Sequence, residues 1–220
     1  MRVTHASLVE GARTATGTAV IIDVFRAFTT AAFAIAAGAR DVVLVADHEQ
    51  ALAMKAADPH LFLTGEIGGR PIPGFDAGNS PSVIQHLDLT GRRVVQRTSQ
   101  GTQCVVAAYA ARRIVLASLV IAGATVRHVR AIGDEVTFVA TSITDPSDGD
   151  EDLACALYLE RQLIDGHAPP PSIRLLGDEE GWPDFFPRED ATLALEVDRF
   201  GFALPVTRES GLLIARPVYA

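Results

Sequence analysis

The sequence predicts an α/β fold, arranged as three layers (α/β/α) around a mainly parallel or mixed sheet. Short β-branched apolar runs alternate along the chain with alanine-rich or amphipathic segments of helical length. The runs are apolar at successive residues, which is typical of strands that are buried on both faces. With 220 residues, 48% of them hydrophobic, the chain suits one domain over residues 1–220. Two structurally related halves that share a core are the alternative.

The first part of the chain reads as strand and helix in turn. The predicted strands are 18–24, 41–46 and 61–63, and the predicted helices are 27–37 and 47–57. Gly38 stands where a helix C-cap belongs, and Asp47 with Gln50 resembles a capping box. The third strand leads directly into a glycine-rich segment.

The second part continues the alternation. The predicted helices are 81–87, 103–111, 121–132, one from the acidic segment 145–152 to about Asp165, and 190–199. The predicted strands are 93–96, 114–117, 136–140, one near Ile173, and a hairpin over 203–218. Ser80 and Pro81 form an N-cap with proline at the first helical position, and Gly166 ends the long helix.

Charge and composition exclude several classes of partner. The formal net charge of −8 argues against a nucleic acid, because a phosphate backbone requires a basic surface. No apolar run is long enough to span a membrane, and residues 1–11 lack the pattern of a signal peptide. Cys104 and Cys155 form no C-x-x-C motif, so we expect a protein of the reducing cytoplasm. A homodimer is an option that the sequence leaves open.

Polar residues follow several of the predicted strands. Asp23, Glu66, the turn 98–102 and the segment 141–152 each come directly after a strand. Ligands of parallel α/β sheets bind beyond the carboxyl ends of the strands. If the sheet is parallel there, these segments converge on one rim.

The segment 64–81 is the most informative stretch of the chain. It contains five glycines and three prolines around Glu66, Arg70 and Asp76, so it reads as an ordered loop that presents groups to a ligand. The two carboxylates are hard oxygen ligands of the kind that Mg²⁺ prefers. A surface connection, or a salt bridge with Arg70, is the alternative. If φ is positive at Gly74, Gly74→Val should harm both folding and activity.

Asp23 and Arg26 lie at a junction between a strand and a helix. A buried aspartate there needs a partner, which could be a divalent cation, Arg26 or the amides of the helix that it caps. Arg26 would stand near a helix N-terminus, where anions are favoured. Several polar residues are candidates for holding such an anion: Asn79, Ser80, Thr98, Ser99, Gly101 and Thr102.

A second group of carboxylates lies before the long helix. Asp145, Asp148, Asp150, Glu151 and Asp152 repel one another, and a cation would relieve that repulsion. Glu151 and Asp152 are the stronger candidates because they enter the helix directly. A solvated acidic helix start is the alternative.

Together these segments resemble the magnesium-dependent 2-phosphosulfolactate phosphatase family. The matching stretches are 23–29 (D-V-F-R-A-F-T), 65–69 (G-E-I-G-G), 74–81 (G-F-D-A-G-N-S-P), 98–102 (T-S-Q-G-T) and 151–156 (E-D-L-A-C-A), in the family's order. The glycine-rich loop is the most specific of them. Two departures are Ile67, where the family motif has arginine, and Gln100, where it has asparagine.

The resemblance implies a Mg²⁺-dependent phosphatase that acts on 2-phosphosulfolactate, a step towards coenzyme M, or on a related small acidic phosphoester. It implies catalytic roles for Asp23, Arg26 and Glu66, and metal ligands at Asp23, Glu66, Asp76 and Asp152. The turn 98–102 would hold the anionic, phosphorylated substrate. The alternative is a non-catalytic protein that binds an anionic metabolite on the same fold.

Overall fold

The computed structural model describes residues 1–133, 135–142, 151–173 and 182–219. Its strands are β1 Val3–Ser7, β2 Thr18–Ile22, β3 Asp41–Leu44, β4 Phe62–Ile67, β5 Arg70–Pro71, β6 Ala77–Gly78, β7 Arg93–Arg97, β8 Arg113–Ala117, β9 Val136–Ala140, β10 Phe202–Glu209, β11 Leu212–Ala215 and β12 Val218–Tyr219. Its α-helices are α1 Leu8–Thr14, α2 Ala27–Ala36, α3 His48–Ala57, α4 Pro81–Ile84, α5 Gly101–Ala107, α6 Ala122–Ile132, α7 Glu151–Asp165 and α8 Arg188–Ala194, and Leu119–Ile121 forms a 3₁₀ turn. The predicted α/β class is confirmed.

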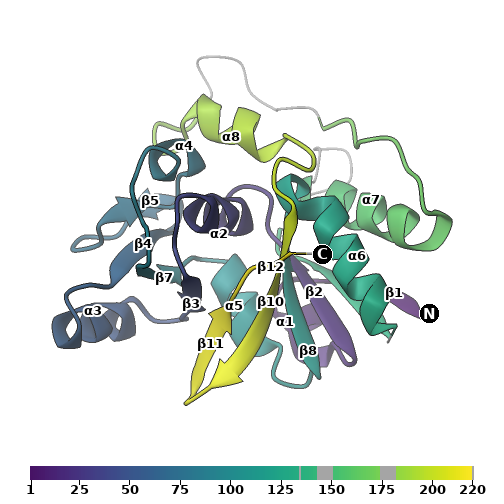
Figure 1. Ribbon diagram of the computed structural model, residues 1–220, viewed down its shortest axis with the longest axis horizontal. Coiled ribbons are helices and arrows are strands. Elements are labelled where there is room, and N and C mark those ends of the chain that lie inside the picture. The colour runs from purple at the N-terminus through teal and green to yellow at the C-terminus, as the bar shows by residue number, and fades with distance from the viewer. Residues whose placement is uncertain (134, 143–150, 174–181, 220) are drawn as a thin grey trace.

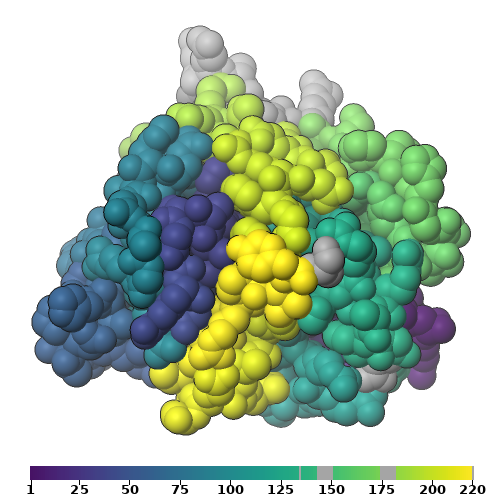
Figure 2. Space-filling model, in the orientation of Figure 1, coloured from purple at the N-terminus to yellow at the C-terminus, as the bar shows by residue number. Residues whose placement is uncertain are grey.

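One mixed sheet contains two groups of parallel strands. Its order is β1-β9-β2-β8-β10-β11-β3-β7-β4-β5, with β12 paired to β10 and β6 paired to β4. The group β1, β9, β2 and β8 is parallel, and so is the group β3, β7 and β4. The antiparallel hairpin β10–β11 joins them in the middle (Figure 1). Figure 2 shows this C-terminal hairpin in yellow between the earlier blue and teal segments.

Helices cover both faces of the sheet. In β2, Ala19 and Ile21 point to the core that contains α1, α2 and α5, whereas Val20 and Ile22 point to α6 and α7. Helix α3 lies on that second face, over β3, β4 and β7. This alternation explains why the strands read as continuous apolar runs, and it gives the three predicted layers.

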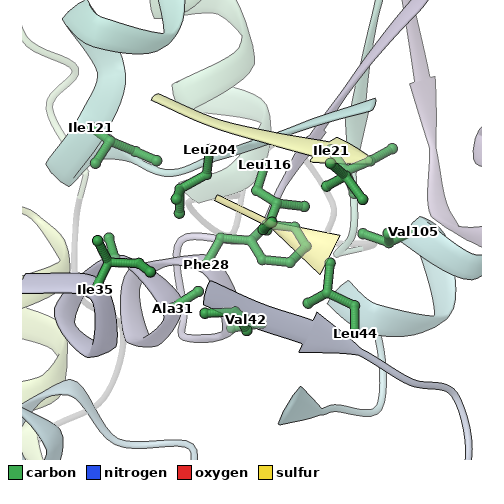
Figure 3. Packing of buried hydrophobic residues seen from close by; sticks show 14 of the residues in the cluster. Ile21, Phe28, Ala31, Ile35, Val42, Leu44, Val105, Leu116, Ile121 and Leu204 are labelled. Atoms are coloured by element: carbon green, nitrogen blue, oxygen red, sulfur yellow. The ribbon is translucent and has the colours of Figure 1, made fainter. Parts of the chain in front are cut away.

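The largest core cluster lies between the two parallel groups. Phe28 of α2 is fully buried, with Leu116 and Leu204 on one side and Val42 and Leu44 on the other (Figure 3). The sheet therefore curves around α2, so that both groups of strands pack on the same helix. This curvature sets where the ends of the strands meet.

Most predicted elements are present, with differences at the ends of the chain. β1 and α1 were not predicted. The helix predicted over 190–199 is α8, which starts after Pro187, since proline lacks an amide to donate. Residues 171–173 carry no strand, and the rest of the strand predicted near Ile173 lies outside the described residues.

The glycine-rich segment is an ordered loop. Gly74 has φ +85°, which meets the condition stated above, and Gly65 has φ +152°. A Cβ on Gly65 would lie 1.9 Å from the carbonyl oxygen of Arg97, so β4 and β7 can approach this closely only with glycine there.

None of the helices in the described ranges has the length and hydrophobicity required to cross a membrane.

Candidate active site

Asp23 follows β2 and is 6% exposed. Its Oδ1 accepts a hydrogen bond of 2.8 Å from the amide of Ala27, so the capping role is one that it performs. Its other oxygen, Oδ2, faces the start of α5. A Cβ on Gly101 would lie 2.6 Å from Oδ2, so glycine lets this helix approach the carboxylate. The structure therefore brings two of the predicted site residues into contact.

Glu66 lies near the end of β4 and is 7% exposed. Its Oε1 accepts from the amide of Ser99 at 2.5 Å, and its Oε2 accepts from the Ser99 hydroxyl at 3.0 Å and the amide of Gly69 at 2.6 Å. The carboxylate thus ties the glycine-rich loop to the turn after β7. Arg70 pairs with Asp184 at 3.4 Å, so the expected alternative, a pair with Glu66 or Asp76, is absent among the described residues.

Asp152 lies in the first turn of α7 and is 2% exposed. Its Oδ1 accepts from the amide of Val24 at 2.7 Å. Its Oδ2 accepts from the amides of Thr141 and Ser142 at 3.2 and 3.1 Å, and from both hydroxyls at 3.0 Å. The carboxylate therefore joins the ends of β2 and β9 to α7. Thr141 and Ser142 were not individually predicted.

The carboxylates of Asp23, Asp152 and Glu66 act on one another electrostatically. Burial, together with the negative charges of Asp152 and Glu66, raises the pKa of Asp23 from 3.8 to about 7. Hydrogen bonds from the amide of Ala27 and the hydroxyl of Thr141 lower this pKa. Three acidic side chains from distant parts of the sequence thus lie close enough to repel one another, and a cation would relieve this repulsion.

The available oxygen ligands fit Mg²⁺ better than a metal that takes all of its ligands from the protein. Within the described ranges, no three His, Cys, Asp or Glu side chains form a ready-made metal cluster. Mg²⁺ usually takes one or two carboxylates and fills its other positions with water and substrate phosphate. Asp23 and Glu66 can supply such a pair of hard oxygen ligands.

The turn 98–102 is fixed by its own threonines. The amide of Thr98 donates to the Thr102 hydroxyl at 2.9 Å, and the amide of Thr102 donates to the Thr98 hydroxyl at 3.1 Å. Both side chains are buried, so they shape the turn from inside. In the described part of the chain, the amides of Gln100 and Gly101 have no hydrogen-bond partner. These amides are available to an anion beside Asp23.

Arg26 and Ser80 meet a carboxylate that was not predicted. Arg26 Nη1 donates to Asp190 Oδ2 at 3.0 Å, and the Ser80 hydroxyl donates to Oδ1 at 2.7 Å. The amide and hydroxyl of Ser82 donate to Oδ1 at 2.9 and 2.6 Å. Asp190 is fully buried on α8, and its only local signal is its place in the first turn after Pro187.

Arg26 also connects this cluster to the glycine-rich loop. Its Nη2 donates to the carbonyl of Gly69 at 3.2 Å, and Gly69 in turn donates to Glu66. Arg26, Gly69, Asn79 and Ser80 line a cavity of about 240 Å³ beside the loop. Three of the predicted binding residues thus share one hollow next to Glu66.

Asp76 is placed apart from these carboxylates. Both of its oxygens accept from Lys55, the only lysine of the chain, and Oδ2 also accepts from the amide of Leu63 at 2.7 Å. No described contact joins it to Asp23 or Glu66, so its role as a metal ligand stays a prediction. Asp145, Asp148 and Asp150 lie outside the described residues.

The fold and the site define a class of protein: an α/β protein with buried, interacting carboxylates near the ends of its strands, where ligands are commonly bound. A model of the 2-phosphosulpholactate phosphatase family matches residues 4–180. The chain belongs to this family, as the sequence motifs indicated.

Relatives from several bacteria are named "Probable 2-phosphosulfolactate phosphatase". The chain is 41% identical to the one from Deinococcus radiodurans over 66% of this chain and 61% of the relative. It is 34% identical to the one from Bacillus subtilis over 67% and 64%, and 35% identical to the one from Thermus thermophilus over 82% and 69%. The chain thus spans less than two thirds of the first two relatives.

Proposed function

We propose that this chain is a Mg²⁺-dependent phosphatase that hydrolyses 2-phosphosulfolactate or a related small acidic phosphoester. The products would be phosphate and a sulfolactate-like alcohol. The observation that carries the proposal is the electrostatic interaction of Asp23, which follows β2, with Glu66 of β4 and Asp152 of α7. The family and the names of the relatives support the same reaction.

Asp23 and Glu66 are the proposed ligands of the cation. When bound, Mg²⁺ would neutralise charge on the phosphoryl oxygens and polarise the bond that breaks. Asp152 joins the residues after β2 and β9 to α7, so we assign it to positioning these two strand ends and to adding negative charge.

The protein's own groups would bind and orient the substrate. The amides of Gln100 and Gly101 would donate to phosphoryl oxygens beside Asp23, at the start of α5. The cavity lined by Arg26, Asn79 and Ser80 would take the remote part of the substrate. The reaction breaks the P–O bond to the carbon-linked oxygen, which leaves with the electron pair and takes a proton from water.

Two routes for the attack on phosphorus fit this site. Water can attack directly, or Asp23 Oδ2 can attack and form an aspartyl-phosphate that water then hydrolyses. Rapid quenching with labelled substrate separates them, since only the second route leaves label on Asp23.

The proposal is tested with 2-phosphosulfolactate and simpler phosphoesters, in Mg²⁺ and in EDTA. Asp23→Asn and Glu66→Gln should each lower kcat/KM by about a hundredfold or more, since each removes a charge at the reacting group. Asp165→Asn, an exposed carboxylate at the end of α7, is the matched control and should behave as wild type. Wild-type rates in both site variants, or full activity in EDTA, would refute the proposal. Tight ligand binding without turnover would instead support the non-catalytic alternative.

A further inference from the structure

A second cavity lies at the opposite ends of the strands that carry Glu66 and the turn 98–102. It measures about 410 Å³, and its walls include Arg40, Asp58, His60, Thr90, Arg92 and Arg93. It lies where β3, β4 and β7 begin, at Asp41, Phe62 and Arg93. Because these strands are parallel, Glu66 lies at their other ends. The cavity is therefore separate from the candidate active site.

Arg92 contributes a positive charge that is held in place. Its Nε donates to the carbonyl of His60 and its Nη2 to the carbonyl of Leu61, both at 3.1 Å. Its guanidinium carbon lies 5.2 Å from the centre of the Phe62 ring. Among the described residues, no carboxylate pairs with Arg92. A guanidinium fixed by neutral groups keeps its full charge for a ligand.

The neighbouring charges do not cancel that of Arg92. Arg93 forms a two-pronged pair with Asp41, at 2.8 and 2.7 Å, so those two charges offset each other. Arg40 is more weakly engaged, since its Nε lies 3.8 Å from Asp41 and its side chain is 57% exposed. Asp58 is the acidic group in the wall, and its Oδ1 accepts from the amide of His60 at 3.1 Å. Two arginines thus face one aspartate, in a chain whose net charge is −8.

We propose that this cavity, here named the Arg92 cavity, binds a small phosphorylated compound. Arg92 and Arg40 would contact the phosphoryl oxygens, because guanidinium groups form strong charge-assisted hydrogen bonds with phosphate. The volume exceeds that of a phosphate ion and falls in the range of small-molecule sites, so it leaves room for an organic part. Asp58 would accept a hydrogen bond from a hydroxyl of that part. This inference does not depend on the proposed phosphatase activity.

Calorimetric titration of the full chain with pyrophosphate tests the inference. EDTA in the buffer keeps divalent cations from drawing the probe to Asp23 and Glu66. We expect one binding event per chain, weakened roughly tenfold or more in both Arg92→Gln and Arg40→Gln, since each loses a charged hydrogen bond. Arg127→Gln, an exposed arginine on α6, is the matched control and should keep wild-type affinity.

Two further variants make the result decisive. Arg40→Glu reverses the charge at an exposed position, so it tests the cavity even if Arg92→Gln disturbs packing against Phe62. Glu66→Gln should leave the pyrophosphate affinity unchanged. Absence of binding in the wild type, unchanged affinity in Arg40→Glu, or a change in Glu66→Gln comparable to that in Arg92→Gln would overturn the inference.

Discussion

Asp23 has two oxygens with different surroundings. Oδ1 caps α2 through the amide of Ala27, whereas Oδ2 faces Gly101 at the start of α5. The cost of burying this carboxylate is thus only partly offset by hydrogen bonds, and the neighbouring Asp152 and Glu66 add repulsion. A carboxylate in such a setting favours either a proton or a cation, and this preference can be measured as a dependence of stability on pH.

We predict that Asp23 makes the metal-free protein less stable as the pH rises from 5 to 7.5. Its pKa is raised from 3.8 to about 7 in the folded state, so its contribution is greatest below pH 3.8 and is lost through pH 7. Over this interval Asp23→Asn should gain roughly 2–3 kcal/mol in free energy of unfolding relative to wild type. Urea unfolding in EDTA at both pH values measures this difference.

The comparison with the variant isolates Asp23 from the other titrating groups, which are common to both proteins. Adding Mg²⁺ should reduce the difference at pH 7.5, because a bound cation stabilises the charged carboxylate. If the stabilities of the two proteins change in parallel with pH, Asp23 does not carry the raised pKa.

At the scale of elements, the hydrophobic pattern predicted the buried strands but did not predict β1 at the edge of the sheet. β2 has five buried residues in succession, a pattern that indicates a central strand. Among the described strands, β1 pairs only with β9, so it is an edge strand. None of its residues is fully buried, and Val3–Ser7 shows no recognisable hydrophobic period. α1 has no side chain that caps its start, and its local signals are limited to Glu10 in the first turn and Arg13 in the last.

The candidate site was predictable where its residues lie at the end of a strand or shortly after it. Asp23 directly follows β2, Glu66 lies near the end of β4, and Gly101 starts α5 shortly after β7. Asp190 was not predicted as a site residue because its role depends on its ion pair with Arg26, which lies 164 residues away in the sequence. The pairing of Asp76 with Lys55 was missed for the same reason, since only the folded chain brings α3 beside the loop.

We predict that Asp190→Asn strongly destabilises the protein. It leaves the guanidinium of Arg26, 6% exposed, without its carboxylate partner, and breaking a buried ion pair in this way costs about 3–5 kcal/mol. Because Asp190 joins α8 to Ser80, Ser82 and Arg26, the loss should appear in the free energy of unfolding measured with urea.

Glu189→Gln is the matched control, because this neighbouring carboxylate is exposed and bonds Gln85 at 3.1 Å. Its effect should stay within about 0.5 kcal/mol. The double variant Arg26→Met/Asp190→Asn should recover part of the stability that Asp190→Asn loses. A loss below about 1 kcal/mol in Asp190→Asn would show that this pair does not hold the elements together.

For the molecule as a whole, the two parallel groups of strands run in opposite directions. The sequence predicts that the segments that follow the strands converge on one rim if the sheet is parallel there. The sheet is not parallel between the two groups, so this condition is not met. Neighbouring strands rotate by about 20–25° in twisted sheets, so the five steps from β2 to β7 turn the strand direction through roughly 100–125°. This rotation offsets much of the reversal, and it accounts for the contact between Asp23, after β2, and Gly101, after β7.

The hairpin β10–β11 lies between the two parallel groups and pairs with a strand of each. Its packing should therefore contribute to the stability of the whole chain. Leu204 of β10 is fully buried and lies opposite Leu116 of β8. We predict that Leu204→Ala lowers the free energy of unfolding by roughly 2–5 kcal/mol, the usual cost of a cavity in a core. Leu157→Ala, at a side chain that is 40% exposed, should cost much less.

The form of the transition distinguishes one cooperative molecule from two independent halves. Because the hairpin pairs with β8 on one side and with β3 on the other, both groups of strands should unfold together. Fluorescence of Trp182, the single tryptophan, and far-ultraviolet circular dichroism should therefore give coincident urea transitions in the wild type and in Leu204→Ala. Two separated transitions would mean that each half keeps its own stability, and that the contact between Asp23 and Gly101 can break without unfolding either half.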